Sequence, residues 1–231
     1  MKKIIVAVIG LLVIAFASSY GQEFETRRAR MVETQIVRRG ITDEAVLRAM
    51  RTVPRHRLVP EKYVESAYDD RPLAIGYGQT ISQPFIVAYM TELLELEPGD
   101  RVLEVGTGSG YQAAVLAEII DEVYSIEIVP ELAKASSERI RSLGYDNIRT
   151  KNADGYYGWK EYAPFDAIIV TAAAEHIPPP LIRQLKDGGR MVIPVGSPFF
   201  TQSLMLVQKK EGRTTTKSMM PVVFVPFTRL K

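Results

Sequence analysis

Hydrophobic positions change their spacing several times along the chain, and each change predicts a different kind of element. From Val102 onward, short β-branched runs alternate with segments whose apolar residues recur every three or four positions. The runs predict strands at 101–105, 122–128, 147–153, 165–173 and 189–196, and the segments between predict helices at 111–120, 130–144 and 179–186. Because strands that alternate with helices form parallel sheets, the sequence predicts an α/β fold with a mostly parallel, doubly wound sheet.

The two ends of the chain follow other patterns. SLMLVQKK, an EGR turn and PVVFVPF predict a C-terminal antiparallel hairpin that completes one edge of the sheet. Residues 23–57 predict two short helices that form an N-terminal cap, the second capped by Thr42, with Asp43 and Glu44 in its first turn, and ended by Pro54. This arginine-rich segment could bind an acidic partner, but its interleaved acidic residues favour a solvated helix face.

The first 21 residues differ from all that follow. Lys2 and Lys3 precede an uncharged apolar run of 14 residues from Ile4 to Ala17, and small and polar residues follow. This order is typical of a signal peptide, and the run is shorter than the about 20 residues that a membrane-spanning helix needs. The sequence therefore predicts a signal peptide or membrane segment at 1–21, cleaved after Ala17 or Gly21, and one domain at 22–231. A retained anchor and a start at Met31 are the alternatives.

Composition excludes several kinds of site. The chain of 231 residues has no cysteine and only two histidines, which excludes disulfides and thiolate zinc sites and argues against a histidine-built metal centre. Its 29 basic residues exceed its 27 acidic ones only by Lys2 and Lys3, so the part beyond the leader is balanced in charge. We therefore expect no metal and no nucleic-acid partner, and membrane contact only through residues 1–21 if they stay attached.

A glycine-rich turn follows the first strand of the alternating region, in the stretch VLEVGTGSGYQ. Gly106, Gly108 and Gly110 give the spacing G-x-G-x-G, whereas a dinucleotide site needs its third glycine at position 111, which is Tyr111. A P-loop is excluded because its Gly-Lys-Ser/Thr ending is missing. The turn either holds a ligand against the main chain or only connects a strand to a helix tightly.

The ends of the next two strands favour a ligand. Glu127 closes the second strand, 21 residues after Gly106, where an acid can accept hydrogen bonds from ribose hydroxyls. Asp154, in NADG after the third strand, could accept from an adenine amino group, although an Asp before Gly also caps turns. Together the three elements predict a nucleoside ligand without a pyrophosphate, and S-adenosylmethionine fits that description.

These three elements resemble the ligand elements of class I S-adenosylmethionine-dependent methyltransferases, which have a Rossmann-like fold. Longer stretches, at 31–60, 75–96 and 165–196, resemble protein-L-isoaspartate O-methyltransferases, and GQTISQP is specific to that family. The resemblance runs from about Met31 to Thr228. It implies methyl transfer to the free carboxylate of L-isoaspartyl residues in damaged proteins and peptides, with S-adenosyl-L-homocysteine as the product. It also implies a cofactor site built from the following residues: Thr80, Ile81, Glu104, Gly106, Thr107, Gly108, Ser109, Gly110, Glu127, Asp154 and Gly155.

By the same resemblance Ser82 is the active-site serine, which we interpret as a donor that orients the acceptor carboxylate. Its position before Gln83 and Pro84 also suits a helix N-cap. A serine hydrolase is disfavoured because Ser109 does not lie in a G-x-S-x-G elbow. The other rival is an exported, non-catalytic nucleoside- or protein-binding module. We expect a monomer exported to the periplasm, with the cytoplasm, where this family ordinarily works, as the alternative.

Overall fold

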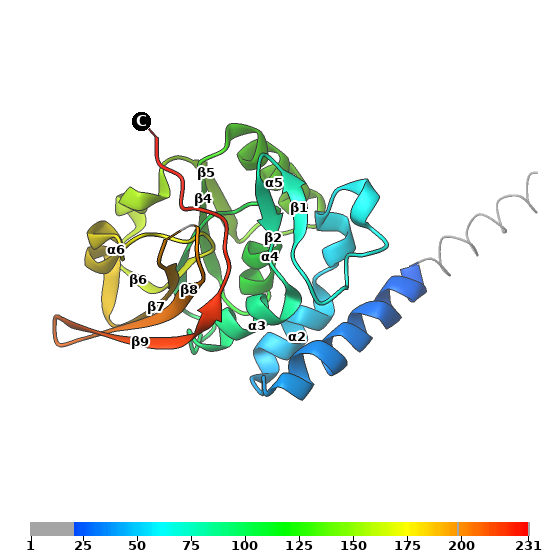
Figure 1. Cartoon of the computed structure of the whole chain (residues 1–231), viewed down its shortest axis with the longest axis horizontal. Helices are drawn as coiled ribbons and strands as arrows, with labels where there is room; N and C mark the ends of the chain where they lie inside the picture. Colours follow the sequence, from blue (N-terminus) through cyan, green and yellow to red (C-terminus); the bar gives the residue numbers. More distant parts are fainter. Residues whose placement is uncertain (1–20, 198, 231) are drawn as a thin grey trace, which may run out of the picture.

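The computed structural model describes residues 21–197 and 199–230, and its centre is a seven-stranded sheet (Figure 1). The strand order is β5-β4-β3-β6-β7-β8-β9, and the neighbouring strands from β5 to β7 are parallel. The bounds are β3 Arg101–Val105, β4 Glu122–Glu127, β5 Ile148–Asn152, β6 Phe165–Val170, β7 Leu185–Val195, β8 Gln202–Lys210 and β9 Arg213–Val222. The predicted α/β fold is thus confirmed.

The C-terminal hairpin is also confirmed, but its second strand was predicted too late in the chain. Strand β9 pairs antiparallel with β8, which pairs antiparallel with β7. β9 starts directly after the turn and ends at Val222, so most of PVVFVPF lies beyond it. Residues 223–230, here called the C-terminal strap, leave the sheet edge and cross toward the loop after β6, where Pro226 forms a bridge with Ala173.

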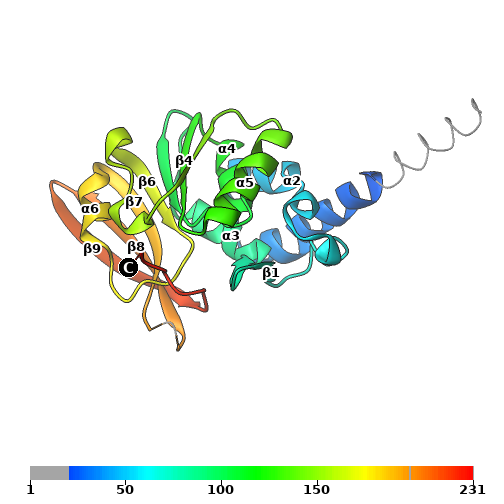
Figure 2. The same cartoon turned by 90° about the horizontal axis from the view of Figure 1, so that it is seen from above.

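Apolar side chains cover both faces of the sheet. Val102 packs on one face with residues of α3, α4 and α5, whereas Leu103 and Val105 pack on the other face with Trp159 and Leu181. This alternation follows from the two-residue period of a strand, and helices lie on both sides of the sheet (Figure 2). The helices are α3 Pro84–Glu92, α4 Tyr111–Ala117, α5 Pro130–Ser142 and α6 Pro179–Gln184.

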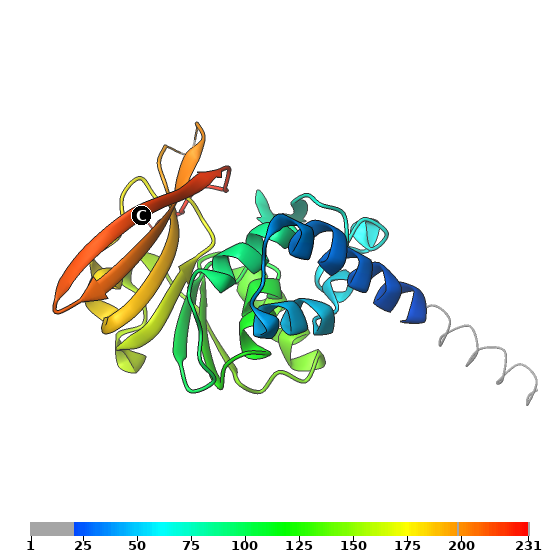
Figure 3. The same ribbon diagram turned by 90° about the horizontal axis from the view of Figure 1, so that it is seen from below.

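The predicted N-terminal helical cap is present. A helix described from residue 21 to 31 continues through a π-helical turn, Val32–Ile36, and a short 3-10 turn, and α2, Glu44–Thr52, follows. Figure 3 shows this cap at the opposite end of the molecule from the β8–β9 hairpin. The N-cap residue of helix α2 was assigned wrongly. The Asp43 carboxylate, and not Thr42, accepts hydrogen bonds from the amides of residues 45 and 46, at 2.8 and 3.1 Å.

A buried guanidinium links the N-terminal cap to the start of α4. Arg55 is fully buried, its Nε donates to the carbonyl of Ala67 at 2.7 Å, and its Cζ lies 4.7 Å from the centre of the Tyr111 ring. Burial lowers the pKa of Arg55 to about 10, so the side chain keeps its charge at neutral pH. Because Tyr111 begins α4 directly after the glycine-rich turn, its contact with Arg55 helps to fix the position of the turn relative to the N-terminal cap.

A small hairpin precedes α3 and was not predicted. Strands β1, Leu73–Gly76, and β2, Gln79–Ile81, pair antiparallel, so GQTIS leads out of a strand and into α3. All of the predicted leader except Gly21 lies outside the described residues. No helix within the described part of the chain has the length and apolar character needed to cross a membrane.

Candidate active site

The glycine-rich turn joins β3 to α4 and needs glycine for its backbone shape. Gly106, Gly108 and Gly110 have φ angles of 102°, 53° and 89°, a region that other L-residues rarely adopt. The amides of Gly106 and Thr107 both donate to the carbonyl of Ile126 in β4, at 2.8 and 3.2 Å. The turn is therefore fixed at the carboxyl end of the sheet, where ligands of open α/β sheets bind.

The side chain of Thr171 packs directly against the backbone of this turn. Its hydroxyl can donate to the carbonyls of Gly106 and Val105, at 2.7 and 3.1 Å. A Cβ added at Gly106 would lie 2.3 Å from that hydroxyl oxygen, so the position has no room for a side chain. A pocket lies at this turn, lined also by residues of β2, β4 and the C-terminal strap. Thr171 directly follows β6 and lines this pocket, yet we did not predict it as a site residue. Its place at the end of a central parallel strand was the available signal.

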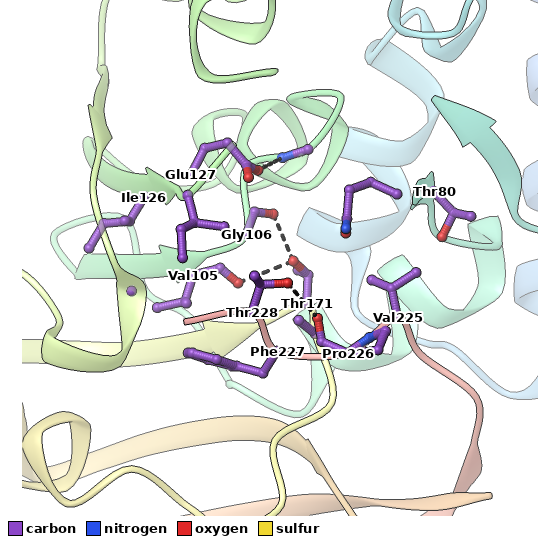
Figure 4. Close-up of a pocket in the computed structure, with 15 residues that line it drawn as sticks. Thr80, Val105, Gly106, Ile126, Glu127, Thr171, Val225, Pro226, Phe227 and Thr228 are labelled. Carbon is purple, nitrogen blue, oxygen red and sulfur yellow. Dashed lines mark hydrogen bonds between the residues drawn. The ribbon is translucent and has the colours of Figure 1, made fainter. Parts of the chain in front are cut away.

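Glu127 ends β4, and its carboxylate lies directly against the glycine-rich turn at the pocket (Figure 4). The residue is 5% exposed, and its two carboxylate oxygens accept hydrogen bonds from the amides of Gly108 and Val129, at 2.7 and 2.9 Å. A carboxylate has about four lone-pair directions, so each oxygen keeps capacity for a ligand hydroxyl. The geometry is compatible with the predicted ribose contact and adds a second role, which is to hold the glycine-rich turn.

We expect Glu127→Ala to weaken binding of S-adenosyl-L-homocysteine by about 1.5 to 3 kcal/mol, because it removes charge-assisted hydrogen bonds. Calorimetric titration measures this loss directly. Glu131→Ala is the matched control, since Glu131 is exposed in the first turn of α5. If the Glu127 variant and the unchanged protein bound S-adenosyl-L-homocysteine with equal affinity, Glu127 would not contact the ligand.

Asp154 has several partners in this structure. Its carboxylate caps a 3-10 turn by accepting the Tyr156 amide at 3.0 Å, and it accepts from Nε of Arg229 at 2.9 Å. The guanidinium of Arg229 also stacks on the Tyr156 ring, 3.6 Å from its centre. The turn-capping interpretation is thus confirmed. The adenine contact stays a prediction, in which an amino group would share this carboxylate with Arg229.

The C-terminal strap forms one wall of the pocket. Val225, Pro226, Phe227 and Thr228 line it opposite Glu127 (Figure 4). The carbonyl of Val225 accepts the Ala173 amide, and the Phe227 amide donates to the Ala173 carbonyl, both at 2.8 Å. This wall was missed because VVFVPF has the composition of a strand, and the residue with which it pairs is more than 50 positions away.

Glu104 lies behind the glycine-rich turn, without any exposure to solvent. It accepts a hydrogen bond from Ser125, whose hydroxyl also lies 2.5 Å from that of Thr107. Its second oxygen has no partner among the described residues. Burial, reinforced by the charge of Glu127, raises the pKa of Glu104 to about 8, so this carboxyl is mostly neutral at pH 7.

This raised pKa makes stability depend on pH. The unfolded chain loses the Glu104 proton near the ordinary value of 4.5, whereas the folded protein holds it until about 8. The contribution of Glu104 to the free energy of unfolding therefore falls as pH rises between these values and is constant above and below them. We expect the free energy of unfolding of Glu104→Gln, taken relative to that of the unchanged protein, to be higher at about pH 9 than at about pH 5, as measured by urea unfolding. If this difference between the two proteins were the same at both pH values, the raised pKa of Glu104 would be contradicted.

Ser82 lies between two cavities. It follows β2 and lines a recess together with Gly106 and Gly108, and it also lines a groove of about 340 Å³ on the outer side. The helix-cap interpretation of Ser82 is wrong, because α3 begins at Pro84 with Gln83 as N-cap and without a side-chain cap bond. The Ser82 hydroxyl has no hydrogen-bond partner among the residues that the structure describes, which leaves it available to a ligand.

The other predicted residues gather around the same turn. Thr80, Gly155, Gly106, Gly108 and Glu127 line the main pocket. Ile81, Thr107 and Ser109 line the adjoining recess. Gly110 is the N-cap of α4. A Cβ at Gly155 would lie 2.3 Å from a methyl group of Val105, so Gly155 lets the 3-10 turn after β5 approach the end of β3 closely. The described residues hold no group of three acidic or histidine side chains suited to a metal.

Comparison with known proteins decides the family. The family model described as protein-L-isoaspartate(D-aspartate) O-methyltransferase matches residues 26–231. The chain belongs to this family. It is 58% identical over 222 residues to a protein-L-isoaspartate O-methyltransferase of Opitutus terrae, covering 96% of this chain and 95% of that protein. It is 63% identical over 187 residues to one of Syntrophobacter fumaroxidans, covering 80% and 76% of the two chains.

Solved structures of the protein-L-isoaspartate O-methyltransferase family have the same fold. One with 28% identity has a TM-score of 0.80 and covers 86% of this chain, which spans 65% of the length of that one. A Plasmodium falciparum protein named as a member of the family, solved in complex with S-adenosyl-L-homocysteine, is 31% identical with a TM-score of 0.76. That alignment covers 87% of this chain and 98% of the other.

Proposed function

We propose that this chain transfers a methyl group from S-adenosylmethionine to the free carboxylate of L-isoaspartyl residues in damaged proteins and peptides. The observation that carries the proposal is that the pocket at the glycine-rich turn meets a second groove at Thr80, which lines both. Two ligands can thus approach each other at β2, as a transfer between a cofactor and a polypeptide requires. The family match supports this enzyme over the non-catalytic binding module.

The residues of the pocket fit the cofactor. Gly106 leaves space where a side chain would collide with Thr171, and Glu127 keeps acceptor capacity toward ribose hydroxyls. The strap covers the opposite side with the apolar side chains of Val225, Pro226 and Phe227. When bound, S-adenosylmethionine supplies a methyl group on a sulfonium, and the chain itself supplies position and shelter from water.

The acceptor needs orientation more than activation. A carboxylate is ionised at pH 7 and can attack a methyl group without first losing a proton. We assign its orientation to the hydroxyl of Ser82, which lies between recess and groove and is a donor without a partner among the described residues. Placement of two reactants in line can contribute about 7 to 11 kcal/mol to catalysis, which agrees with a site that has no evident general base.

A pair of peptides tests the function. Two peptides of one sequence, one with L-isoaspartate and one with aspartate, are incubated with the enzyme and labelled S-adenosylmethionine. We expect label only in the isoaspartyl peptide. Binding of S-adenosyl-L-homocysteine without labelling of either peptide would instead support the non-catalytic module.

We further propose that residues 1–21 direct export and that the remainder works as a monomer outside the cytoplasmic membrane. The short apolar run after two lysines supports export, and the absence of cysteine means that folding does not depend on the redox state of the compartment. Cell fractionation followed by N-terminal sequencing is expected to find a soluble periplasmic chain that begins near residue 18 or 22. A chain in the cytosol that still carries Met1 would refute export, and the same chain in the membrane fraction would indicate a retained anchor.

A further inference from the structure

The outer groove beside Ser82 carries one charged side chain. Arg39, from the 3-10 turn after the N-terminal helix, lines the groove, and its other lining residues are apolar or uncharged polar. Arg39 does not line the cofactor pocket or the recess at the glycine-rich turn. A polypeptide bound in the groove would therefore meet the charge of Arg39 outside the pocket and the recess at the glycine-rich turn.

The guanidinium of Arg39 is held in place on two sides. Its Nη1 donates to the Asp70 carboxylate at 3.2 Å, and its Cζ lies 3.5 Å from the centre of the Phe85 ring in α3. Asp70 also accepts from Nε2 of Gln83 at 2.7 Å, and Gln83 lines the same groove. This network connects Arg39 to the residue next to Ser82, so the charge keeps a defined place in the groove.

Part of the guanidinium remains available to a ligand. Neither Nε nor Nη2 of Arg39 has a hydrogen-bond partner among the described residues, and the side chain is 38% exposed. A planar guanidinium with two unused nitrogens is suited to a carboxylate. Asp70 does not line the groove, but it pairs with Nη1 and reduces the net charge that an anionic group of the polypeptide meets at the free side of Arg39, so only a modest preference is expected.

We propose that Arg39 determines specificity by favouring isoaspartyl sites that have an acidic side chain next to the isoaspartate and disfavouring those with a basic one. The inference rests on the proposed function of the groove. In the proposed function the acceptor carboxylate is hydrogen-bonded by Ser82, which lines both the recess and the groove. Arg39 lines only the groove. Arg39 therefore contacts a neighbouring residue of the polypeptide and leaves the attacking carboxylate free of an ion pair.

Peptides that differ in one residue test this assignment. Isoaspartyl peptides carry Glu, Gln or Lys directly before or directly after the isoaspartate, and kcat/KM is measured for each. At low salt we expect Glu to exceed Lys about two- to fivefold in at least one of the two positions, which is the range for an exposed ion pair. This ratio should shrink at high salt because ions screen exposed charges.

Variants separate the charge of Arg39 from its packing. Arg39→Gln should bring the Glu-to-Lys ratio close to one, whereas Arg39→Lys should keep the preference for Glu. Arg38→Gln is the matched control, because Arg38 is an exposed neighbour in the same turn that does not line the groove. Each ratio compares two peptides on one enzyme sample, so a loss of folded protein cancels.

Two results would overturn the assignment. The first is an unchanged enzyme that methylates all the isoaspartyl peptides equally at low salt. The second is an Arg39→Gln variant that keeps the preference for Glu. Failure to methylate any isoaspartyl peptide would instead refute the proposed function, so the two failures are distinguishable.

Discussion

Replacement of Gly106 by alanine is expected to lower the affinity for S-adenosyl-L-homocysteine by about 2 to 4 kcal/mol, which is about 30- to 1000-fold. Two costs add at this position. Gly106 has a φ of 102°, which strains any residue with a Cβ, and that Cβ would lie 2.3 Å from the hydroxyl oxygen of Thr171. The turn must move to relieve both, and the wall of the cofactor pocket moves with it.

Calorimetric titration with a matched glycine variant tests this expectation. Gly99→Ala is the control, because no atom lies within 4 Å of a Cβ at Gly99 and its φ is outside the left-handed region. Adding Thr171→Ala to the Gly106 variant removes the collision but not the strain, so partial recovery of affinity is expected. If Gly106→Ala bound the ligand as tightly as Gly99→Ala did, the turn would not be the cofactor site.

The second large effect is expected at Ser82. Ser82→Ala should reduce kcat on an isoaspartyl peptide by about tenfold to a thousandfold, the range for removal of one donor that acts on the reacting group. Affinity for S-adenosyl-L-homocysteine should change little, because Ser82 lines the recess and the groove and not the main pocket. Steady-state kinetics and calorimetry together separate these two quantities.

The control for this variant is Ser218→Ala, an exposed serine in β9. It should leave both quantities unchanged. A full rate for Ser82→Ala would remove Ser82 from the acceptor site. A parallel loss of rate and cofactor affinity would indicate that Ser82 supports the glycine-rich turn and does not orient the acceptor.

The sequence predicts those parts of the fold that depend on local patterns. β3 has the predicted bounds, because its apolar residues Val102, Leu103 and Val105 lie between clear turn signals. The cap of α2 was missed by one residue, since Thr42 and Asp43 both suit an N-cap and only the backbone conformation selects Asp43. The short β1–β2 hairpin has too few residues for a strand pattern to emerge.

The parts of the site that could not be predicted depend on contacts between distant segments. The glycine-rich turn and Glu127 were found because their spacing within one strand–helix–strand unit is characteristic. Thr171 and the strap are near this turn only after the sheet has formed. Arg229 reaches Asp154 across 75 positions of sequence, so no local pattern could have indicated that ion pair.

The residues that line the pocket come from several segments between Gln79 and Thr228, so ligand binding is coupled to the folding of all of them. Such a site does not survive the unfolding of any one of these segments, so a ligand bound there opposes unfolding of the whole domain. By linkage, each tenfold rise in ligand concentration above its dissociation constant adds about 1.4 kcal/mol to the free energy of unfolding. The concentration of the methyl donor, and of its demethylated product, around the enzyme thus helps to set how well it resists heat and proteolysis.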